Sequence, residues 1–600
     1  MTTSEYEDHQ KAERMKANMA RIEELTARLT NALAQREQPR ASLQAPDSDI
    51  FVQATAAFWT EMVKNPSKIL EKQLDYWGKS LKHAVEAQEA LRSGKLQAPE
   101  DHTQADRRFA NPLWKTHPYF NYIKQQYLMA SEAVNDAVLA LDTMTPREKK
   151  RLQYFTQQIV DMMAPTNFLA TNPDALMKAV ETEGESLIKG LENLVHDIEA
   201  GGGELLVSLA DKEAFKVGEN LATSPGKVVF RNRMFELIQY TPTTEKVYRT
   251  PVVIFPPWIN KFYIMDLKPQ NSLIKWIVDQ GYTLFVVSWV NPDASYADAG
   301  MDTYVEEGYL EAIRVAKEIT GEAQVNAVGY CIAGTTLSLV LALMNKRKDK
   351  SVRSATFFTT LTDFSDQGEV GVFLEDDFVD GIEAECNENG YLDSFFMSRT
   401  FSFLRSNDLI YAPAIRSYMM GEAPPAFDLL YWNGDGTNLP GRMCVEYLRG
   451  LCQHDRFASA SFAICGQEVS IKDVKHPLCA IACETDHIAA WRSSFRGMSK
   501  MGSRDKTFIL SQSGHIAGII NPPSKKKYGH YTGTPPEGSP DDWKAAAEFN
   551  EGSWWPRWDG WLSKRSGAKV DARIPGDSGY PALGDAPGQY VISSKNDDMS

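Results

Sequence analysis

One cysteine of the sequence has neighbours that suit a nucleophile. Cys331 lies in the string Gly329-Tyr330-Cys331-Ile332-Ala333, between an apolar run typical of a strand and a stretch typical of a helix. Small residues two positions before and after the cysteine permit a sharp strand-to-helix turn, which exposes the thiol at the start of the helix. The positive end of the helix dipole favours a thiolate there, and the Ile332 N–H could donate to an oxyanion. A buried structural cysteine is the alternative when this string is taken alone.

A nucleophile of this kind needs a base and an acid that orients the base. Where the nucleophile lies on such a turn, the acid and the histidine follow it in that order, each after a later strand. Asp486 follows the run PLCAIAC at 477–483, and His515 follows KTFILSQS at 506–513. We therefore predict Asp486 as the acid and His515 as the base.

Two neighbours of Asp486 compete for these roles. His487 adjoins Asp486 directly, and adjacent residues on one chain seldom reach a proper acid–base geometry, so we expect it to orient substrate or to be structural. Glu484 is the weaker acid candidate and is expected to be solvated. Three further histidines have no strand end before them and are expected at the surface: His454, His476 and His530.

The second oxyanion donor should come from the loop after the first core strand. That loop is FPPWINK at 255–261, and the N–H of Trp258 or of Ile259 could serve. The alternative is that the two prolines only shape the strand exit. Asn291-Pro292-Asp293 follows the next strand as a turn, with Asp293 capping what comes after it. A place for Asp293 near the substrate is the second possibility.

Six apolar runs alternate with helical stretches and must position these groups. Continuous apolar strands separated by helices predict a parallel sheet with both faces covered. We therefore expect an α/β-hydrolase fold. The runs are VVIFPPW (252–258), TLFVVSWV (283–290), QVNAVGYC (324–331), SATFFTTL (354–361), PLCAIAC (477–483) and KTFILSQS (506–513).

The alternation is confined to part of the chain, which predicts two domains. Residues 1–215 are mostly helical in pattern, and residues 216–600 form the catalytic domain with a cap or lid inserted at about 364–470. A periodic apolar stripe over 10–36 predicts an amphipathic helix, which either packs on its own domain or binds a granule or partner. Residues 37–49 are polar and rich in breakers, as linkers are. The stretch 566–600 is expected to be extended or disordered.

Composition excludes several classes of function. The net charge of −15 is unlike that of nucleic-acid binders, which need a concentrated basic surface. Lys525-Lys526-Lys527 is interpreted as a solvated loop rather than a contact for coenzyme A phosphates. No run of 18 apolar residues suits a membrane span, and no signal peptide is evident at the N-terminus. Seven cysteines without a CxxC pair predict free thiols in a reducing cytoplasm, and we expect no metal site.

Several long motifs, in order, resemble those of class I polyhydroxyalkanoate synthases. The resemblance runs from about 105 to 590. The motifs are DRRF (106–109), APTNFLATNP (164–173), PPWINKFYIMDL (256–267), SWVNPD (288–293), GYCIA (329–333), FDLL with WN (427–433), TDHI (485–488) with Trp491, SGHIAGIINPP (513–523) and GSWWPRWDGWL (552–562).

The resemblance implies a function. Members of that family polymerise (R)-3-hydroxyacyl-CoA into polyester with release of coenzyme A, through an acyl-cysteine. It implies a short-chain substrate such as 3-hydroxybutyryl-CoA, a homodimer, and a cytoplasmic enzyme at the polymer granule surface. Coenzyme A enters as part of the substrate, so no cofactor is expected. The chain departs from the family pattern at Val290, Ala333, Cys444 and Thr485. None of these removes a proposed catalytic group.

Two other functions use the same features. A cysteine hydrolase, either a thioesterase or a polyester depolymerase, would have the same Cys331, Asp486 and His515, and only the product would distinguish it. A noncatalytic, granule-coating scaffold would need none of the three groups.

Overall fold

The computed structural model describes residues 3–34, 66–92, 106–141 and 144–592, which form two compact units. One unit is helical and contains the described residues up to Asp211 together with 401–425. The other runs from Lys212 to Thr400 and resumes at Ala426. The predicted linker at 37–49 lies outside the described residues.

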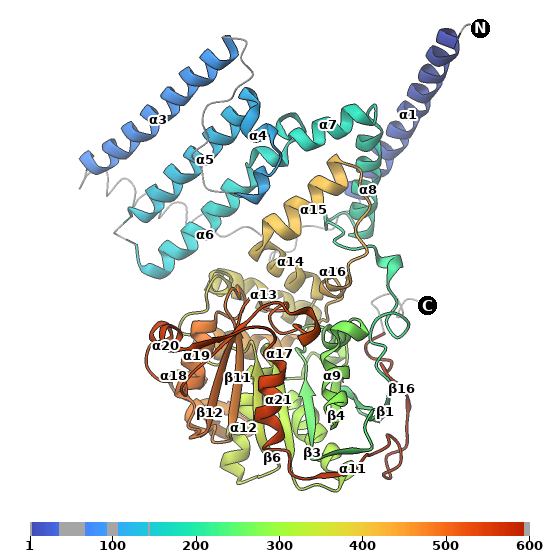
Figure 1. Ribbon diagram of the computed structural model, residues 1–600, viewed down its shortest axis with the longest axis vertical. Coiled ribbons are helices and arrows are strands. Elements are labelled where there is room, and N and C mark those ends of the chain that lie inside the picture. Colours follow the sequence, from blue (N-terminus) through green and yellow to red (C-terminus); the bar gives the residue numbers. More distant parts are fainter. Residues whose placement is uncertain (1–2, 35–65, 93–105, 142–143, 593–600) are drawn as a thin grey trace. The chain divides into compact units, whose positions relative to one another are not determined.

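The helical unit contains seven α-helices before residue 211 in its described part and three short helices near residue 410 (Figure 1). Prolines begin several of them, at the position where the missing N–H costs nothing. They are α1 (Thr3–Ala34), α3 (Pro66–Arg92), α4 (Leu113–Thr116), α5 (Pro118–Leu139), α6 (Pro146–Met162), α7 (Pro173–Glu181), α8 (Glu185–Ala200), η11 (Asn407–Tyr411), α15 (Ala412–Ala414) and η12 (Ile415–Met419).

The periodic N-terminal segment forms α1, and it packs on its own unit. Leu25 is buried against Ile188 and Val195 of α8. Arg28 on α1 pairs with Glu199 on α8 at 2.7 Å. The apolar stripe therefore covers α8, which is the packing alternative of the two that the sequence allowed.

Residues 401–425 lie in the helical unit although the sequence places them within the predicted insertion. The Tyr418 hydroxyl donates to the buried Asp197 carboxylate on α8 at 2.6 Å. The Asn407 amide donates to Asp161 on α6 at 3.0 Å. Asp161 also forms an ion pair with the Arg108 guanidinium of the DRRF string at 2.9 Å, so this motif stabilises the helical unit from within.

A twelve-stranded sheet is the core of the second unit within the described residues. Its order is β14-β13-β12-β11-β6-β5-β3-β4-β2-β1-β16, and β15 pairs with β3. The six predicted strands are neighbours at its centre and all run parallel. They are β3 (Lys246–Phe255), β4 (Tyr282–Trp289), β5 (Val325–Tyr330), β6 (Val352–Phe358), β11 (Leu478–Cys483) and β12 (Lys506–Ser511).

Antiparallel strands extend the sheet at both edges, and one of them, β15, pairs instead with the start of the central strand β3. They are β1 (Gly226–Arg231), β2 (Phe235–Tyr240), β13 (His530–Thr532), β14 (Glu548–Asn550), β15 (Lys569–Asp571) and β16 (Gly584–Asp585). The last two come from the C-terminal stretch, which is extended along the sheet up to residue 592. The Glu236 carboxylate of β2 fixes the end of this C-terminal stretch by accepting the N–H groups of Gln589 and Tyr590 at 2.8 and 3.0 Å.

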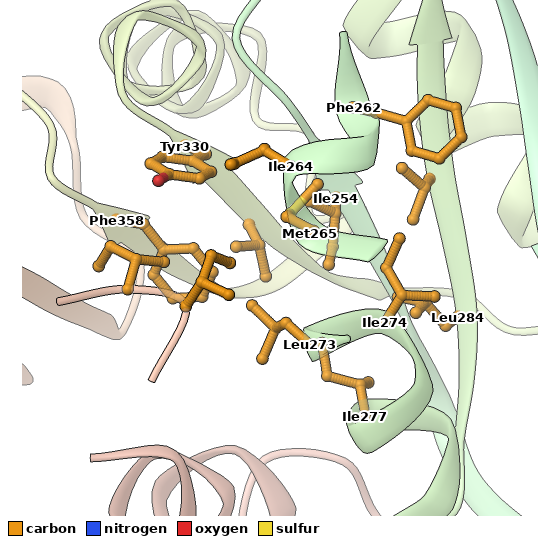
Figure 2. Packing of buried hydrophobic residues seen from close by; sticks show 14 of the residues in the cluster. Ile254, Phe262, Ile264, Met265, Leu273, Ile274, Ile277, Leu284, Tyr330 and Phe358 are labelled. Atoms are coloured by element: carbon orange, nitrogen blue, oxygen red, sulfur yellow. The ribbon is translucent and has the colours of Figure 1, made fainter. Parts of the chain in front are cut away.

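Helices cover both faces of the sheet, as the continuous apolar strands require. On one face, Val252 and Ile254 of β3 join α9 (Leu273–Asp279) and α21 (Trp555–Ser563) in one buried cluster. Figure 2 shows Leu273, Ile274 and Ile277 of α9 directed at the strands. On the other face, the Phe255 ring stacks on Tyr309 with centroids 4.2 Å apart. Tyr309 belongs to the π-helix η9 (Tyr304–Leu310), which leads into α11 (Glu311–Thr320). The α/β-hydrolase prediction is confirmed.

The excursion between β6 and β11 contributes short helices, the β9–β10 hairpin and the β7–β8 pair to the second unit, except for residues 401–425. They are η10 (Val370–Phe373), α13 (Asp376–Asn389), β7 (Tyr391–Leu392), α14 (Ser394–Leu404), α16 (Asp428–Asn433), β8 (Leu439–Pro440), α17 (Gly441–Val445), η13 (Glu446–Gln453), α18 (Arg456–Ser459), β9 (Phe462–Ile464), β10 (Gln467–Val469) and η14 (Ile471–Asp473). Elsewhere lie η6 (Phe262–Asp266), α10 (Met301–Thr303), α12 (Ile332–Arg347), α19 (Trp491–Lys500) and α20 (Pro540–Ala546).

Candidate active site

Cys331 occupies a strained turn between a strand and a helix. β5 ends at Tyr330, α12 begins at Ile332, and Cys331 between them has φ 54° and ψ −125°. A positive φ in a residue other than glycine costs on the order of 1–3 kcal/mol and persists only where the surroundings impose it. Here the Cys331 N–H donates to the Phe358 carbonyl of β6 at 2.8 Å. The thiol is half-buried at the first turn of α12.

Small residues make this turn possible. A Cβ on Gly329 would lie 2.6 Å from the Gly334 Cα, and a Cβ on Gly334 would lie 2.1 Å from the Thr360 hydroxyl oxygen. Ala333 is fully buried between these two glycines, and its carbonyl accepts the Tyr309 hydroxyl at 2.9 Å. The close approach of helix and strand thus depends on Gly329 and Gly334.

His515 and Asp486 meet in the loops that follow β12 and β11. The His515 Nδ1 lies 2.7 Å from Asp486 Oδ2. The Asp486 side chain is fully buried and that of His515 is 9% exposed. Asp486 Oδ1 accepts the N–H groups of Ile488 and Ala489, each at 2.8 Å. All of the Asp486 carboxylate is therefore engaged, and it faces the imidazole in a fixed orientation.

The charges around His515 favour its protonated form. Burial disfavours an imidazolium, but the charge of the Asp486 carboxylate, that of the Cys331 thiolate and the bond to Asp486 raise the pKa of His515 well above its usual value. Because Nδ1 is bonded to Asp486, Nε2 is the nitrogen left to exchange a proton with the thiol. Cys331, His515 and Asp486 form one electrostatically connected array.

The loop that contains Asp486 and the loop that contains His515 are hydrogen-bonded to each other and to the core. The Thr485 N–H donates to the Ser513 carbonyl at 3.0 Å. The Tyr330 hydroxyl, beside the cysteine, donates to the His515 carbonyl at 3.3 Å. From α21 and the residue before it, the indoles of Trp554 and Trp555 donate to the carbonyls of Gly518 and Ile519 at 2.8 and 2.9 Å. The tryptophan-rich motif near the C-terminus therefore fixes the loop that carries His515.

The competing residues have other partners. Glu484 forms an ion pair with Lys544 of α20. His487 is half-buried beside Asp486, and the hydrogen bond of Asp486 goes to His515 instead. His530 is buried in β13 and its Nδ1–H donates to the Gly552 carbonyl at 2.9 Å, so the expectation that it lies at the surface was wrong. Its strand is only three residues long and gave no clear apolar pattern.

The predicted oxyanion donors come from two elements, the start of α12 and the loop after β3. Ile332 begins α12, where the first N–H groups have no partner in the helix. Phe255, the last residue of β3, is paired with Gly329 of β5, so the loop that contains Trp258 and Ile259 starts beside the turn of Cys331. The Trp258 indole donates to Thr336 on α12 at 3.2 Å. Among the described residues, no acceptor takes the backbone N–H of Trp258 or Ile259.

Asp293 is exposed, and its carboxylate accepts the N–H of Ser295 at 2.8 Å at the start of η8 (Ala294–Tyr296). The predicted capping turn is confirmed. Its contact with substrate stays a prediction.

One tyrosine near the nucleophile was missed in the sequence. Tyr447 of η13 is buried with its ring edge against Trp258, the centroids 5.3 Å apart. Burial raises the pKa of Tyr447, and the Cys452 and Cys331 thiols add to the effect. No spacing relates Tyr447 to Cys331, since the fold of the insertion alone brings them together.

In the described ranges, no group of three or more His, Cys, Asp or Glu residues could hold a metal ion. None of the helices described combines the length and apolar character that a membrane crossing requires. All seven cysteines of the sequence lie in described residues and are free thiols.

Comparison with known proteins identifies the family. The model for the N-terminus of poly-beta-hydroxybutyrate polymerase (PhaC) matches residues 105–277, and that for the alpha/beta hydrolase fold matches residues 250–522. The poly(3-hydroxyalkanoate) polymerase subunit PhaC of Rhizobium meliloti is 38% identical over 591 residues, covering 96% of this chain and 95% of that protein. The chain belongs to the poly(3-hydroxyalkanoate) polymerase family.

Other members of this family are similarly close. The PhaC subunit of Rhizobium etli is 39% identical over 553 residues, or 89% of this chain and 86% of that protein. The PhaC subunit of Cupriavidus necator is 39% identical over 493 residues, which cover 81% of this chain and 83% of that protein. The resemblance seen in the motifs is thus confirmed over most of the polymerase chain.

Proposed function

We propose that this polymerase joins (R)-3-hydroxyacyl groups from coenzyme A thioesters into a polyester, with Cys331 as the acyl carrier. The observation that carries the proposal is the connected array of Cys331, His515 and Asp486 at a strained turn, in a chain of the polymerase family. The family supplies the reaction class. The array supplies a nucleophile, a base and an orienting acid in the arrangement used for acyl transfer.

The first half-reaction is thioester exchange. His515 Nε2 takes the thiol proton, and the Cys331 sulfur attacks the acyl carbonyl carbon. The oxyanion that forms is stabilised by the Ile332 N–H and by an N–H of the loop at 255–261. When the carbon–sulfur bond to coenzyme A breaks, the imidazolium returns its proton to the leaving thiolate. Attacking and leaving groups are both thiolates, so the exchange is nearly isoenergetic.

The second half-reaction forms the ester. The hydroxyl of another 3-hydroxyacyl group gives its proton to His515 and attacks the acyl-cysteine, and the Cys331 thiolate leaves and is reprotonated. The Asp486 carboxylate is occupied by two N–H groups and the imidazole. These contacts support a role in orienting His515 rather than in activating the hydroxyl directly. The chemistry requires side chains and the thioester substrate, so we propose that no cofactor takes part.

Three finer points belong to the same proposal. Short-chain monomers such as 3-hydroxybutyryl-CoA are the proposed substrates, the active form is a homodimer, and the enzyme works in the cytoplasm at the surface of its polymer granule. They are supported by membership of the polymerase family.

The test is incubation with 3-hydroxybutyryl-CoA while free thiol and insoluble product are followed together. The proposal predicts that thiol release and polymer rise in parallel, and that Cys331→Ala shows neither. Release of free 3-hydroxybutyrate without polymer would identify a hydrolase. Undiminished thiol release in Cys331→Ala would remove Cys331 from the mechanism.

A further inference from the structure

A threonine from the insertion holds the loop that follows β3. The Thr437 hydroxyl donates to the Trp258 carbonyl at 2.8 Å, and the Thr437 N–H donates to the Ile259 carbonyl at 3.1 Å. Asn260 and Gly436 form an isolated antiparallel bridge beside these bonds. Thr437 is only 2% exposed, so water does not compete for the two carbonyls. A single residue thereby fixes two consecutive peptide planes.

The first of these planes contains the N–H of Ile259. In a trans peptide, the carbonyl of one residue and the N–H of the next point in opposite directions. Binding the Trp258 carbonyl on one side therefore directs the Ile259 N–H to the other. This peptide is the central one of a turn closed by the Asn260 N–H and the Pro257 carbonyl at 3.4 Å. The hydrogen bond of a turn does not hold its central peptide, so Thr437 supplies the constraint.

The loop lies next to the nucleophile. Phe255 is in register with Gly329, two residues before Cys331. The Trp258 indole is bonded to Thr336 in the first turns of α12. The Ile259 N–H has no acceptor among the described residues, which leaves it available to a ligand.

We infer that Thr437 is a positioning residue that aims the Ile259 N–H at the acyl oxyanion, making Ile259 rather than Trp258 the second donor. The inference rests on the proposed function of Cys331 as the acyl carrier. A preorganised donor stabilises the transition state because it needs no reorientation when the charge develops. Thr437 does not touch substrate. Its effect passes through the peptide it holds.

The neighbours of Thr437 explain why the segment 432–438 can bear this role. The Trp432 indole donates to the Lys261 carbonyl at 2.7 Å, and the Asn438 amide donates to the Pro292 carbonyl at 3.1 Å. Lys261 and Asp435 form an ion pair at 2.8 Å. The segment is therefore held at both ends without Thr437, and removing one hydroxyl should release the Trp258 carbonyl without releasing the segment.

The test compares Thr437→Val, which replaces the hydroxyl by a methyl group of similar size, with Thr437→Ser, which keeps it. Removal of an oxyanion donor lowers kcat by about 10²–10³-fold, and misorientation of one should cost about 10–100-fold. Because the donor acts in the transition state, kcat for coenzyme A release should fall while KM stays within about twofold. Thr437→Ser should keep kcat within about threefold of the parent. Thr320→Val is the matched control, since its hydroxyl bonds only carbonyls of α11.

A second readout separates this role from a structural one. When iodoacetamide alkylates Cys331, the sulfur attacks the CH₂ carbon of the reagent and displaces iodide, so no oxyanion forms. The rate of alkylation should therefore be unchanged in Thr437→Val. Equal losses of alkylation and of kcat would mean that the threonine only supports the fold, and an unchanged kcat would mean that it does nothing for catalysis; either result overturns the inference.

Two further comparisons keep the outcome decisive. If Thr437→Val does not fold, Thr437→Ala removes the same hydroxyl without the branched methyl group and is compared with Thr437→Ser in the same way. The proposed function is checked separately by Cys331→Ala. If that variant still releases coenzyme A, the acyl-carrier proposal fails. If it does not, and Thr437→Val is fully active, only the present inference fails.

Discussion

Replacing Asp486 by asparagine tests the array with the smallest change in shape. One carboxylate oxygen accepts two N–H groups, from Ile488 and Ala489, and the other meets His515 Nδ1. An asparagine would keep its carbonyl on the two N–H groups and turn its NH₂ to the imidazole. Nδ1 would then have to accept, which puts the proton on Nε2. In that tautomer His515 cannot take the proton of Cys331.

The magnitude follows from two losses. A hydrogen bond to a charged partner is worth about 1.5–3 kcal/mol in a protein, and 1.4 kcal/mol is tenfold in rate. Loss of the buried carboxylate charge therefore costs roughly 10–100-fold through the imidazolium. The wrong tautomer lowers the rate further, and the same substitution in a serine triad lowers kcat by about 10⁴-fold. We expect coenzyme A release to fall by at least about 10³-fold, and alkylation of Cys331 at pH 7 to slow with it.

The assay is the initial rate of thiol release from 3-hydroxybutyryl-CoA at saturating substrate, with thermal unfolding measured in parallel. Asp197→Asn is the control, because Asp197 is also buried but accepts only from Ser208 and Tyr418 in the helical unit. It should keep the rate within about threefold. A loss of less than about tenfold in Asp486→Asn, with the protein folded, would refute the assignment of Asp486 as the orienting acid.

Three other changes have outcomes that the structure determines. Gly334→Ala would set a Cβ 2.1 Å from the Thr360 hydroxyl oxygen, so it should lower the unfolding free energy by about 2 kcal/mol or more. Gly560 lies on an exposed face of α21 with open space around it, so Gly560→Ala should raise the unfolding free energy by no more than about 1 kcal/mol. Chemical denaturation measures both variants, and equal effects would contradict the packing argument. Trp554→Phe leaves the Gly518 carbonyl without its indole donor, so we expect a loss of about 1–3 kcal/mol together with reduced kcat, and full activity would show that the His515 loop does not need this bond. Burial lowers the pKa of His530 from 6.5, so as the pH falls below 6.5 the unfolded chain binds this proton before the folded chain does, and the fold loses stability. His530→Gln should therefore show a shallower decline in unfolding free energy between pH 7 and 5. An unchanged slope would contradict this role of His530.

The sequence predicted the centre of the sheet and missed its edges. The six parallel strands are buried on both faces, so each is a continuous apolar run that can be recognised alone. β13, β15 and β16 are two or three residues long, and pairing with distant strands, rather than their own pattern, makes them strands. The longer β1 and β2 contain polar residues such as Glu236, whose burial depends on the C-terminal stretch that it binds.

The same distinction holds at the site. Cys331, Asp486 and His515 could be found because each follows a recognisable strand, and the ends of parallel strands meet at one edge of a sheet. Tyr447 and Thr437 come from the irregular insertion, where no periodicity fixes which residue faces the cysteine. The role of Trp554 was equally hidden, since a buried indole and the carbonyl it binds are 36 residues apart.

The most direct measurement is the mass of the enzyme during turnover. The enzyme turns over 3-hydroxybutyryl-CoA, the reaction is quenched with acid, and the peptides are mapped by mass spectrometry. The peptide that contains Cys331 should carry one or more 3-hydroxybutyryl units in thioester linkage. The adduct should be absent from Cys331→Ala and should accumulate less in Asp486→Asn. Polymer formation by an enzyme whose Cys331 never carries an acyl group, or acylation at another residue, would contradict the account.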